Sequence, residues 1–190
     1  MTRTVSDARS RLLGTASRLF YAEGLHSVGV DRIVAEAKVT RATMYRHFTG
    51  KEDLVVAYLA EADQATRRQV EAAVASASSD ADAVRAVASG IAGHIRIEQF
   101  RGCAFLNAAA EYADPAHPVH MAVLAHRQWF LDTVTGLLAR VGDAPADVDG
   151  RHFVMLRDGA MAAGCLSDPG PIGDTLVMAV EGILRARLSG

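Results

Sequence analysis

Apolar side chains recur every three or four residues along nearly the whole chain, and this spacing is typical of amphipathic helices. No segment alternates apolar and polar residues as a strand does, and no Asn-Gly pair marks a hairpin turn. The periodic stretches end at glycine, at proline and at short polar runs, all of which interrupt helices. The sequence therefore predicts an all-α fold of about nine helices, without internal repeats.

The expected helices follow from the positions of these breaks. The first runs from about Ser6 to Tyr21 and ends before Gly24. Two short helices follow at about 30–37 and 41–47, and a long helix begins near Lys51. The remaining helices are expected at about 83–95, with Asp80 and Asp82 as candidate caps, and at about 105–112, 120–141, 149–166 and 172–188, with Asp149 as a candidate cap for the 149–166 helix.

The charged residues are distributed unevenly. Residues 1–60 carry nine basic and six acidic side chains, whereas residues 61–190 carry eleven basic and sixteen acidic ones. The net charge of −2 therefore combines a basic N-terminal part, which suits a polyanionic partner, with an acidic remainder. No apolar run is long enough to span a bilayer and the N-terminus has no apolar signal-peptide stretch, so we expect a cytoplasmic protein with no membrane partner.

Residues 30–48 contain two short helical patterns separated by a tight turn, which is the arrangement of a helix-turn-helix. Ile33, Ala37 and Val39 are expected to face inward. Met44 and Phe48, four residues apart on the second helix, are expected to meet them. The other positions of that helix include no acidic residue, as expected of a helix that enters the major groove of DNA. Two solvated helices of an ordinary bundle would give a similar pattern, so the pattern alone leaves both interpretations open.

A wider stretch carries a more specific pattern. It contains Leu19-Phe20 and Gly24, then Asp31-Arg-Ile-Val-Ala-Glu-Ala37, then Val39-Thr-Arg-Ala-Thr-Met-Tyr-Arg-His-Phe48, and finally Lys51-Glu-Asp-Leu54. This stretch resembles the DNA-binding domain of the TetR family, the tetracycline-repressor-like transcription regulators. The resemblance implies a DNA-binding domain at residues 1–50 and a ligand-binding and dimerisation domain at residues 51–190.

The resemblance also implies roles for single residues. Thr40 matches a capping hydroxyl, and Arg41, Ala42 and Thr43 match positions that face the bases. Arg46 belongs to the same predicted surface, with a merely solvated side chain as the alternative. The matches to phosphate-contacting positions are Tyr45, which could instead lie partly in the core, His47, and Lys51 at the start of the next helix, where the free N–H groups also attract anions.

Two positions depart from the family's pattern. Lys38 stands in the turn where the family usually has glycine, and a non-glycine residue in a left-handed turn costs about 1 kcal/mol. We expect the Lys38 side chain to compensate by reaching a phosphate. Gly29 stands where a Ser or Thr cap is common, and glycine is an acceptable cap.

The C-terminal helices are expected to bind a small-molecule effector. Asn107 and Glu111 are four residues apart and share a helix face, where they either anchor a ligand or cap and bridge neighbouring helices. Large residues nearby are candidates for the pocket wall, with ordinary core packing as the alternative, and their aromatic character favours a hydrophobic or aromatic effector. They are Tyr58, Phe100, Cys103, Phe105, Leu106, Tyr112, Trp129, Phe130 and Met155.

No metal, cofactor or catalytic site is expected. Cys103 and Cys165 lack the close spacing of a metal or redox pair, so buried, reduced thiols are expected, although a redox role for Cys103 stays open. His117, His120 and His126 invite a metal interpretation. The first two lie near the start of a predicted helix, where we expect solvated loop side chains.

The last two helices are expected to form a homodimer. Small residues such as Gly159 and Gly164 let helices approach closely, and two helices from each subunit would form a four-helix bundle across a two-fold axis. Such a dimer requires a palindromic operator with half-sites about one turn apart or slightly more. The apolar face assigned to this interface comprises Phe153, Leu156, Ala160, Met161, Ala163, Leu176, Val180, Ile183 and Leu184.

These expectations combine into a ligand-responsive repressor that binds a double-stranded DNA operator and is released by a small molecule. The resemblance implies that ligand binding moves the helix beginning near Lys51 as a lever and shifts the population away from the DNA-bound state. An activator, or a regulator whose ligand promotes binding, would have the same domains. An enzyme using Cys103 and His120 is disfavoured because no nucleophile elbow or phosphate loop is present. The recognition helix, which is the helix expected at about 41–47, argues against a simple ligand carrier.

Overall fold

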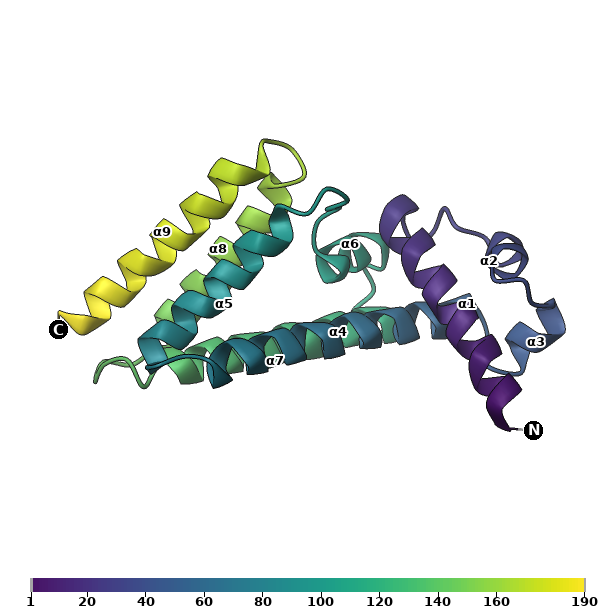
Figure 1. Ribbon diagram of the computed structural model, residues 1–190, viewed down its shortest axis with the longest axis horizontal. Helices are drawn as coiled ribbons and strands as arrows, with labels where there is room; N and C mark the ends of the chain where they lie inside the picture. Colours follow the sequence, from purple (N-terminus) through teal and green to yellow (C-terminus); the bar gives the residue numbers. More distant parts are fainter. Residues whose placement is uncertain (1, 190) are drawn as a thin grey trace. The chain divides into compact units, whose positions relative to one another are not determined.

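The computed structural model describes residues 2–189, and that range contains nine α-helices and no strand (Figure 1). The prediction of an all-α fold is confirmed. Among the described residues, no helix has both the length and the apolar composition needed to cross a membrane. In chain order the helices are α1 (Thr2–Glu23), α2 (Val30–Glu36), α3 (Arg41–Tyr45), α4 (Lys51–Ala75), α5 (Asp80–Ile95), α6 (Ala104–Glu111), α7 (Pro118–Leu138), α8 (Asp147–Ala163) and α9 (Pro169–Leu188).

Several helices begin before the expected residue, α1 among them at Thr2 rather than Ser6, and two of these early starts have local reasons. α5 is capped by Ser79, whose hydroxyl accepts a first-turn backbone N–H at 3.1 Å, so a serine takes the place of the expected aspartate cap. α9 begins at Pro169, inside the predicted break, because the first turn of a helix has no use for the N–H that proline lacks. Asp168 caps this helix by accepting the N–H of Gly170 at 3.0 Å.

The helices form two compact units, and α4 and α7 contribute residues to both. The first unit contains the residues up to Asp63 together with Ala104–Leu124, and the second contains Gln64–Cys103 and the residues from Ala125 onward. The boundary predicted at residue 50 does not coincide with the edge of a compact unit, and as a division between two functions it stays a prediction.

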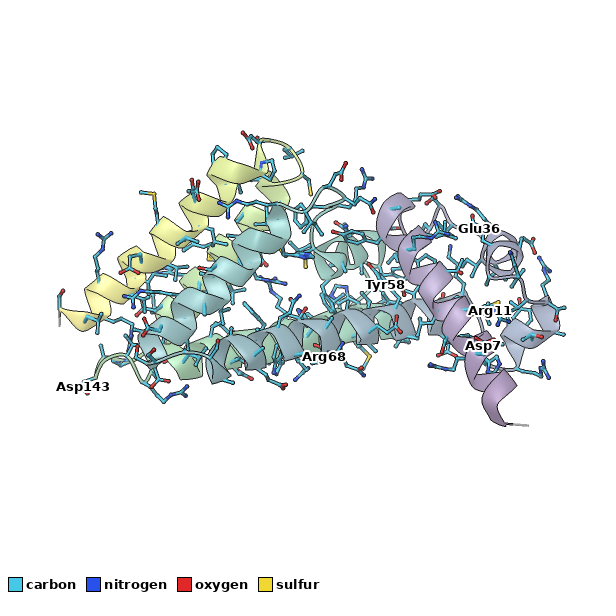
Figure 2. The ribbon with its side chains drawn as sticks, viewed as in Figure 1. Asp7, Arg11, Glu36, Tyr58, Arg68 and Asp143 are labelled. Atoms are coloured by element: carbon cyan, nitrogen blue, oxygen red, sulfur yellow. The ribbon has the colours of Figure 1, made fainter. Side chains whose placement is uncertain are left out.

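The core of the first unit holds the two short helices in place. α1 packs against α2 and α3, which also pack against each other. Leu19, Ile33 and Met44 are fully buried where these helices meet. Tyr58 of α4, labelled in Figure 2, is buried with its ring centre 6.0 Å from that of Phe20. The orientation of α3 is thus fixed by apolar packing against a much longer helix.

In the second unit, α9 lies along α5 and α8 (Figure 1). This packing overturns much of the predicted dimer face, because most of its apolar residues are buried inside the unit. An amphipathic pattern shows that a helix has a buried face, but it does not show whether the same chain or a partner covers it. The residues assigned wrongly are Phe153, Ala160, Met161, Leu176, Val180 and Leu184.

A buried arginine ties the end of α9 to the loop between α7 and α8. The Arg187 guanidinium donates to the Leu138 carbonyl at 3.0 Å, to the Ala144 carbonyl at 2.7 Å and to the Asp149 carboxylate at 2.7 Å. Asp149, expected as a helix cap, therefore serves as the partner of a buried cation, since α8 begins two residues earlier. Arg187 supplies hydrogen bonds that the loop cannot make for itself.

α8 approaches α7 closely near its start. A Cβ atom placed on Gly150 would lie 2.0 Å from the Thr135 hydroxyl oxygen and 3.3 Å from the Thr135 Cα. Only glycine leaves room for the two backbones at this distance.

Candidate nucleic-acid interface

The helix-turn-helix has the buried face that the sequence predicts. Ile33, Ala37, Met44 and Phe48 are all buried, whereas Val39 is half-buried. α3 ends at Tyr45, two residues before the expected end, and a turn carries the chain on to Phe48. These contacts fix the two short helices so that the remaining side chains of α3 face outward.

The turn between α2 and α3 has the left-handed residue that the sequence predicts. Lys38 has a φ angle of +53° and is the one non-glycine residue with positive φ in the described part of the chain. Its side chain is exposed. The conformation costs about 1 kcal/mol relative to glycine, so the turn stores strain next to the recognition helix.

Thr40 caps α3 as expected. Its hydroxyl oxygen accepts the backbone N–H of Thr43 at 3.1 Å, and the two threonine hydroxyls lie 2.9 Å apart. The Arg46 guanidinium donates to the Thr43 hydroxyl at 3.0 Å. A short polar network therefore runs along the outward face of α3 and limits the freedom of the Arg46 side chain.

The outward face of α3 is well exposed. Arg41, Ala42, Tyr45 and Arg46 are exposed, and Thr43 and His47 are half-buried. Tyr45 exposes 54% of its surface, so the alternative that it lies partly in the core is wrong. An exposed phenol beside two arginines provides hydroxyl and guanidinium donors of the kind that phosphates and base edges accept.

The sequence reasoning missed an acidic neighbour of this face. Asp31 of α2 accepts a hydrogen bond from Arg41 Nε at 2.6 Å, and this carboxylate raises the pKa of the Arg41 guanidinium. Both side chains are exposed. The spacing of ten residues between them is not a helical repeat, so no periodicity could have pointed to the pair.

Lys51, the predicted phosphate anchor, lies at the first position of α4 and is half-buried. Its ammonium donates to the His26 carbonyl at 3.1 Å. Burial lowers the pKa of Lys51, and the nearby Glu111 carboxylate opposes that shift. One of the three ammonium donors is thus engaged within the protein, which leaves two for another acceptor.

The predicted effector-binding residues fall into both compact units. Those of the first unit are Tyr58, Phe105, Leu106, Asn107, Glu111 and Tyr112, and those of the second are Phe100, Cys103, Trp129, Phe130 and Met155. Asn107 and Met155 are exposed, so ordinary core packing does not account for these two. The Glu111 carboxylate accepts backbone N–H groups of the α1–α2 turn, as the capping alternative expects.

Within the second unit, Cys103 is buried as expected and Cys165 is exposed, against expectation. The buried Arg157 guanidinium lies 3.5 Å from the Cys103 sulfur and 4.8 Å from the centre of the Phe130 ring. A second cation, Arg67, lies 4.1 Å from the centre of the Trp129 ring. Arginine side chains thus cover two of the predicted aromatic residues.

The histidines have more specific contacts than the sequence indicated. His117 and His120 are half-buried rather than solvated, because the α6–α7 connection folds onto Tyr112. The His120 ring nitrogen lies 2.6 Å from the Tyr112 carbonyl, and His126 is buried beside Trp129. Among the described residues, no three His, Cys, Asp or Glu side chains are arranged to hold a metal ion.

Comparison with known proteins bears directly on this interface. Residues 12–58 match the family model of the bacterial regulatory proteins, tetR family. The chain superposes on a crystal structure of a TetR-family transcriptional regulator from Streptomyces coelicolor with a TM-score of 0.95 and 66% identity, covering 96% of this chain and 97% of that one.

Curated relatives match over only part of the chain. An uncharacterized HTH-type transcriptional regulator of Bacillus subtilis, YxaF, is 41% identical over 51 residues, which are 26% of this chain and 27% of that protein. The HTH-type transcriptional activator FasR of Mycolicibacterium smegmatis is 38% identical over 53 residues, 28% of this chain and 24% of its own length. The match thus spans about a quarter of the length of each of these two proteins.

Proposed function

The chain belongs to the TetR family of transcriptional regulators, and we propose that it is a repressor that binds a palindromic DNA operator as a homodimer and releases it when a small molecule binds. The family is one of regulators rather than enzymes. The observation that carries the proposal is the outward face of α3, where Arg41, Tyr45 and Arg46 are exposed on a helix held rigidly by α1.

The proposed DNA contacts divide into two classes. Arg41, Ala42 and Thr43 lie in the first turn of α3, where side chains reach base edges in the major groove. Phosphate contacts are proposed for the remaining residues because they surround the helix with hydroxyl, imidazole and cationic groups. These are Lys38, Thr40, Tyr45, Arg46, His47 and Lys51.

Dimerisation is proposed through the exposed faces of α8 and α9 rather than through the buried residues named from the sequence. Met155 exposes 68% of its surface and Met178 exposes 72%, and small residues at Gly159 and Gly182 stand one turn along the same helices. Large exposed apolar side chains next to small ones suit close helix packing across a two-fold axis. A palindromic operator would match that symmetry.

The effector is proposed to be a small hydrophobic or aromatic molecule. The support is the apolar composition of α6, whose residues 104–111 contain a single charged side chain, Glu111. An activator is the second candidate, because FasR is by name an activator and is 38% identical to this chain over 53 residues. Both candidates use the same DNA-binding surface and differ only in what DNA binding does to transcription.

The experiment is fluorescence anisotropy of the purified protein on the DNA upstream of its own gene, across a salt series. We expect tight binding whose affinity falls steeply as salt rises, because phosphate contacts release counterions. Arg41→Ala should weaken specific binding by roughly tenfold or more and relax the preference at one base pair. Arg68→Ala, which removes an exposed arginine of α4 outside the helix-turn-helix, is the matched control (Figure 2). Equal binding to random DNA would contradict the proposal, and a reporter gene would separate repression from activation.

A further inference from the structure

The last residue of α6 binds the turn that precedes the helix-turn-helix. One Glu111 carboxylate oxygen accepts the backbone N–H of Leu25 at 2.8 Å, and the other accepts the backbone N–H of His26 at 2.6 Å. Leu25 and His26 lie 86 and 85 positions before Glu111 in the sequence, and all three residues belong to the same compact unit. A carboxylate that accepts two backbone N–H groups forms strong, charge-assisted hydrogen bonds.

The turn is shaped to receive this carboxylate. Gly24 has a φ angle of +95°, and a Cβ atom placed on it would lie 3.3 Å from a Glu111 carboxylate oxygen. The absence of a side chain at Gly24 therefore serves both the backbone conformation and the close approach of the carboxylate.

His26 is held from three sides. Its backbone N–H donates to the Glu111 carboxylate, its ring Nε2 lies 2.8 Å from the Glu111 carbonyl oxygen, and its own carbonyl accepts the Lys51 ammonium. The turn therefore connects the end of α6 with the first residue of α4. Lys51 is also a proposed phosphate contact. The same side chain therefore belongs both to the proposed DNA-binding surface and to the set of contacts that Glu111, His26 and Lys51 form, which we call the clamp.

Aromatic rings close the same junction. The Tyr112 ring lies between the rings of His26 and His117, with both pairs of ring centres 4.6 Å apart. The His117 Nε2 atom lies 3.4 Å from the Glu52 carboxylate at the start of α4. Movement of the end of α6 would therefore strain the stack as well as the hydrogen bonds.

We propose that Glu111 is the positioning residue through which α6 holds the α1–α2 turn and Lys51, and with them the helix-turn-helix, in the arrangement that binds DNA. This inference rests on the proposed function. α6 also carries residues proposed to contact the effector, so a ligand that displaces the end of α6 would loosen the turn at Leu25 and His26. By linkage, DNA bound to the helix-turn-helix must in turn stabilise α6 by the same free energy.

The test compares Glu111→Gln and Glu111→Ala with the wild-type protein and with Glu61→Gln as a matched control. Glu61 accepts a hydrogen bond from the Ser17 hydroxyl at 3.1 Å, so the control removes one negative charge at a contact between α1 and α4 in the same unit. The DNA probe is a duplex selected from a random-sequence library by the wild-type protein. Affinity is measured by anisotropy at a temperature at which circular dichroism shows all four proteins fully folded.

Amide hydrogen exchange read by NMR supplies a second readout. We expect the Leu25 and His26 amides to exchange faster in Glu111→Ala, and the affinity for the selected duplex to fall by about tenfold, within the usual range of coupling between sites. Glu111→Gln should have an exchange rate and a DNA affinity between those of the wild-type protein and Glu111→Ala, because its amide oxygen still accepts one hydrogen bond. DNA should slow exchange in residues 104–111 of the wild-type protein and of Glu61→Gln, and should fail to do so in Glu111→Ala.

Two results would overturn the proposal. Unchanged exchange at Leu25 and His26 in Glu111→Ala would show that the carboxylate does not hold the turn. Faster exchange with unchanged DNA affinity would show that the clamp is structural only. A wild-type protein that selects no duplex would instead refute the proposed function, and the inference about Glu111 would fail with it.

Discussion

The helix-turn-helix and the bundle of α5, α8 and α9 both carry exposed arginine ion pairs, but the bundle also buries two arginines. Around α2, Arg32 bridges Glu23 and Glu36, Arg18 pairs with Glu36, and all of these side chains face solvent at least in part. In the second unit, by contrast, the side chains of Arg157 and Arg187 expose only 6% and 3% of their surface.

The difference in burial determines which arginines can change their ion-pair partners. Exposed ion pairs contribute little to stability because water and salt compete for them, so their arginines can change partners at small cost. A buried guanidinium has no such freedom, because removing its partners leaves a charge that the interior cannot solvate. The first region is therefore suited to meeting an external anion, and the second to fixing its own loops.

The strongest way to break this comparison is to remove a buried arginine. Arg187→Ala should lower the free energy of unfolding by about 3–5 kcal/mol, since the Asp149 carboxylate and four backbone carbonyls lose their donor. Denaturant unfolding followed by circular dichroism measures the effect. Arg185→Ala, an exposed arginine of the same last turn, is the control and should leave stability nearly unchanged. Similar losses in the two variants would show that burial is not the cause.

A smaller loss of stability is expected from a substitution where α8 approaches α7 closely. Gly150→Ala should cost about 1–3 kcal/mol of unfolding free energy, because the added methyl group would overlap Thr135. Adding Thr135→Ala should restore part of the loss. Gly14→Ala in α1 is the matched control, since a Cβ there meets nothing within 4 Å. A Gly150→Ala protein as stable as wild type would mean that α7 and α8 can move apart freely.

In the first region, Lys38→Gly should raise stability by up to about 1 kcal/mol, because glycine adopts the left-handed turn without strain. If Lys38 contacts a phosphate, the same change should lower DNA affinity and reduce the salt slope by about one. Thermal unfolding and anisotropy separate the two effects. Unchanged affinity and salt slope would exclude the phosphate contact and leave the strain without a compensating role.

The smallest effect should come from Arg32→Ala. This change removes ion pairs to Glu23 and Glu36, yet we expect the unfolding midpoint to stay within the scatter of repeated measurements, because the pairs are exposed. At high salt the unfolding midpoints of Arg32→Ala and the wild-type protein should likewise agree. A clear loss of stability would show that these ion pairs hold α2 in place and would narrow the contrast between the two regions.

Local features of the fold could be predicted from the sequence. The buried face of the helix-turn-helix follows from the spacing of Ile33, Met44 and Phe48, and the cap of α3 follows from Thr40. The strained turn at Lys38 was expected from the family resemblance. Each of these depends on residues within one helix or its adjoining turn, which is the range over which periodicity and capping act.

Long-range pairings could not be predicted in the same way. Nothing in the sequence joins Glu111 to Leu25, or Arg187 to Asp149, because such contacts depend on how helices pack. The same limit explains the error over the dimer face: Phe153 and Leu184 belong to a genuine apolar stripe, but their own chain covers it. The exposure of Met155 and Met178 can be recognised only once that packing is known.

The pairing of Arg41 with Asp31 also has a kinetic consequence. On the proposed function, a regulator must sample a great length of unrelated duplex before it meets its operator, and each encounter that lasts too long delays the search. A carboxylate beside Arg41 weakens its hold on phosphates in general, so unproductive encounters end sooner. On the proposed function, a duplex that offers the Arg41 guanidinium a better acceptor than Asp31 would hold the protein longer, and Asp31 would shorten the time that the protein spends on other DNA.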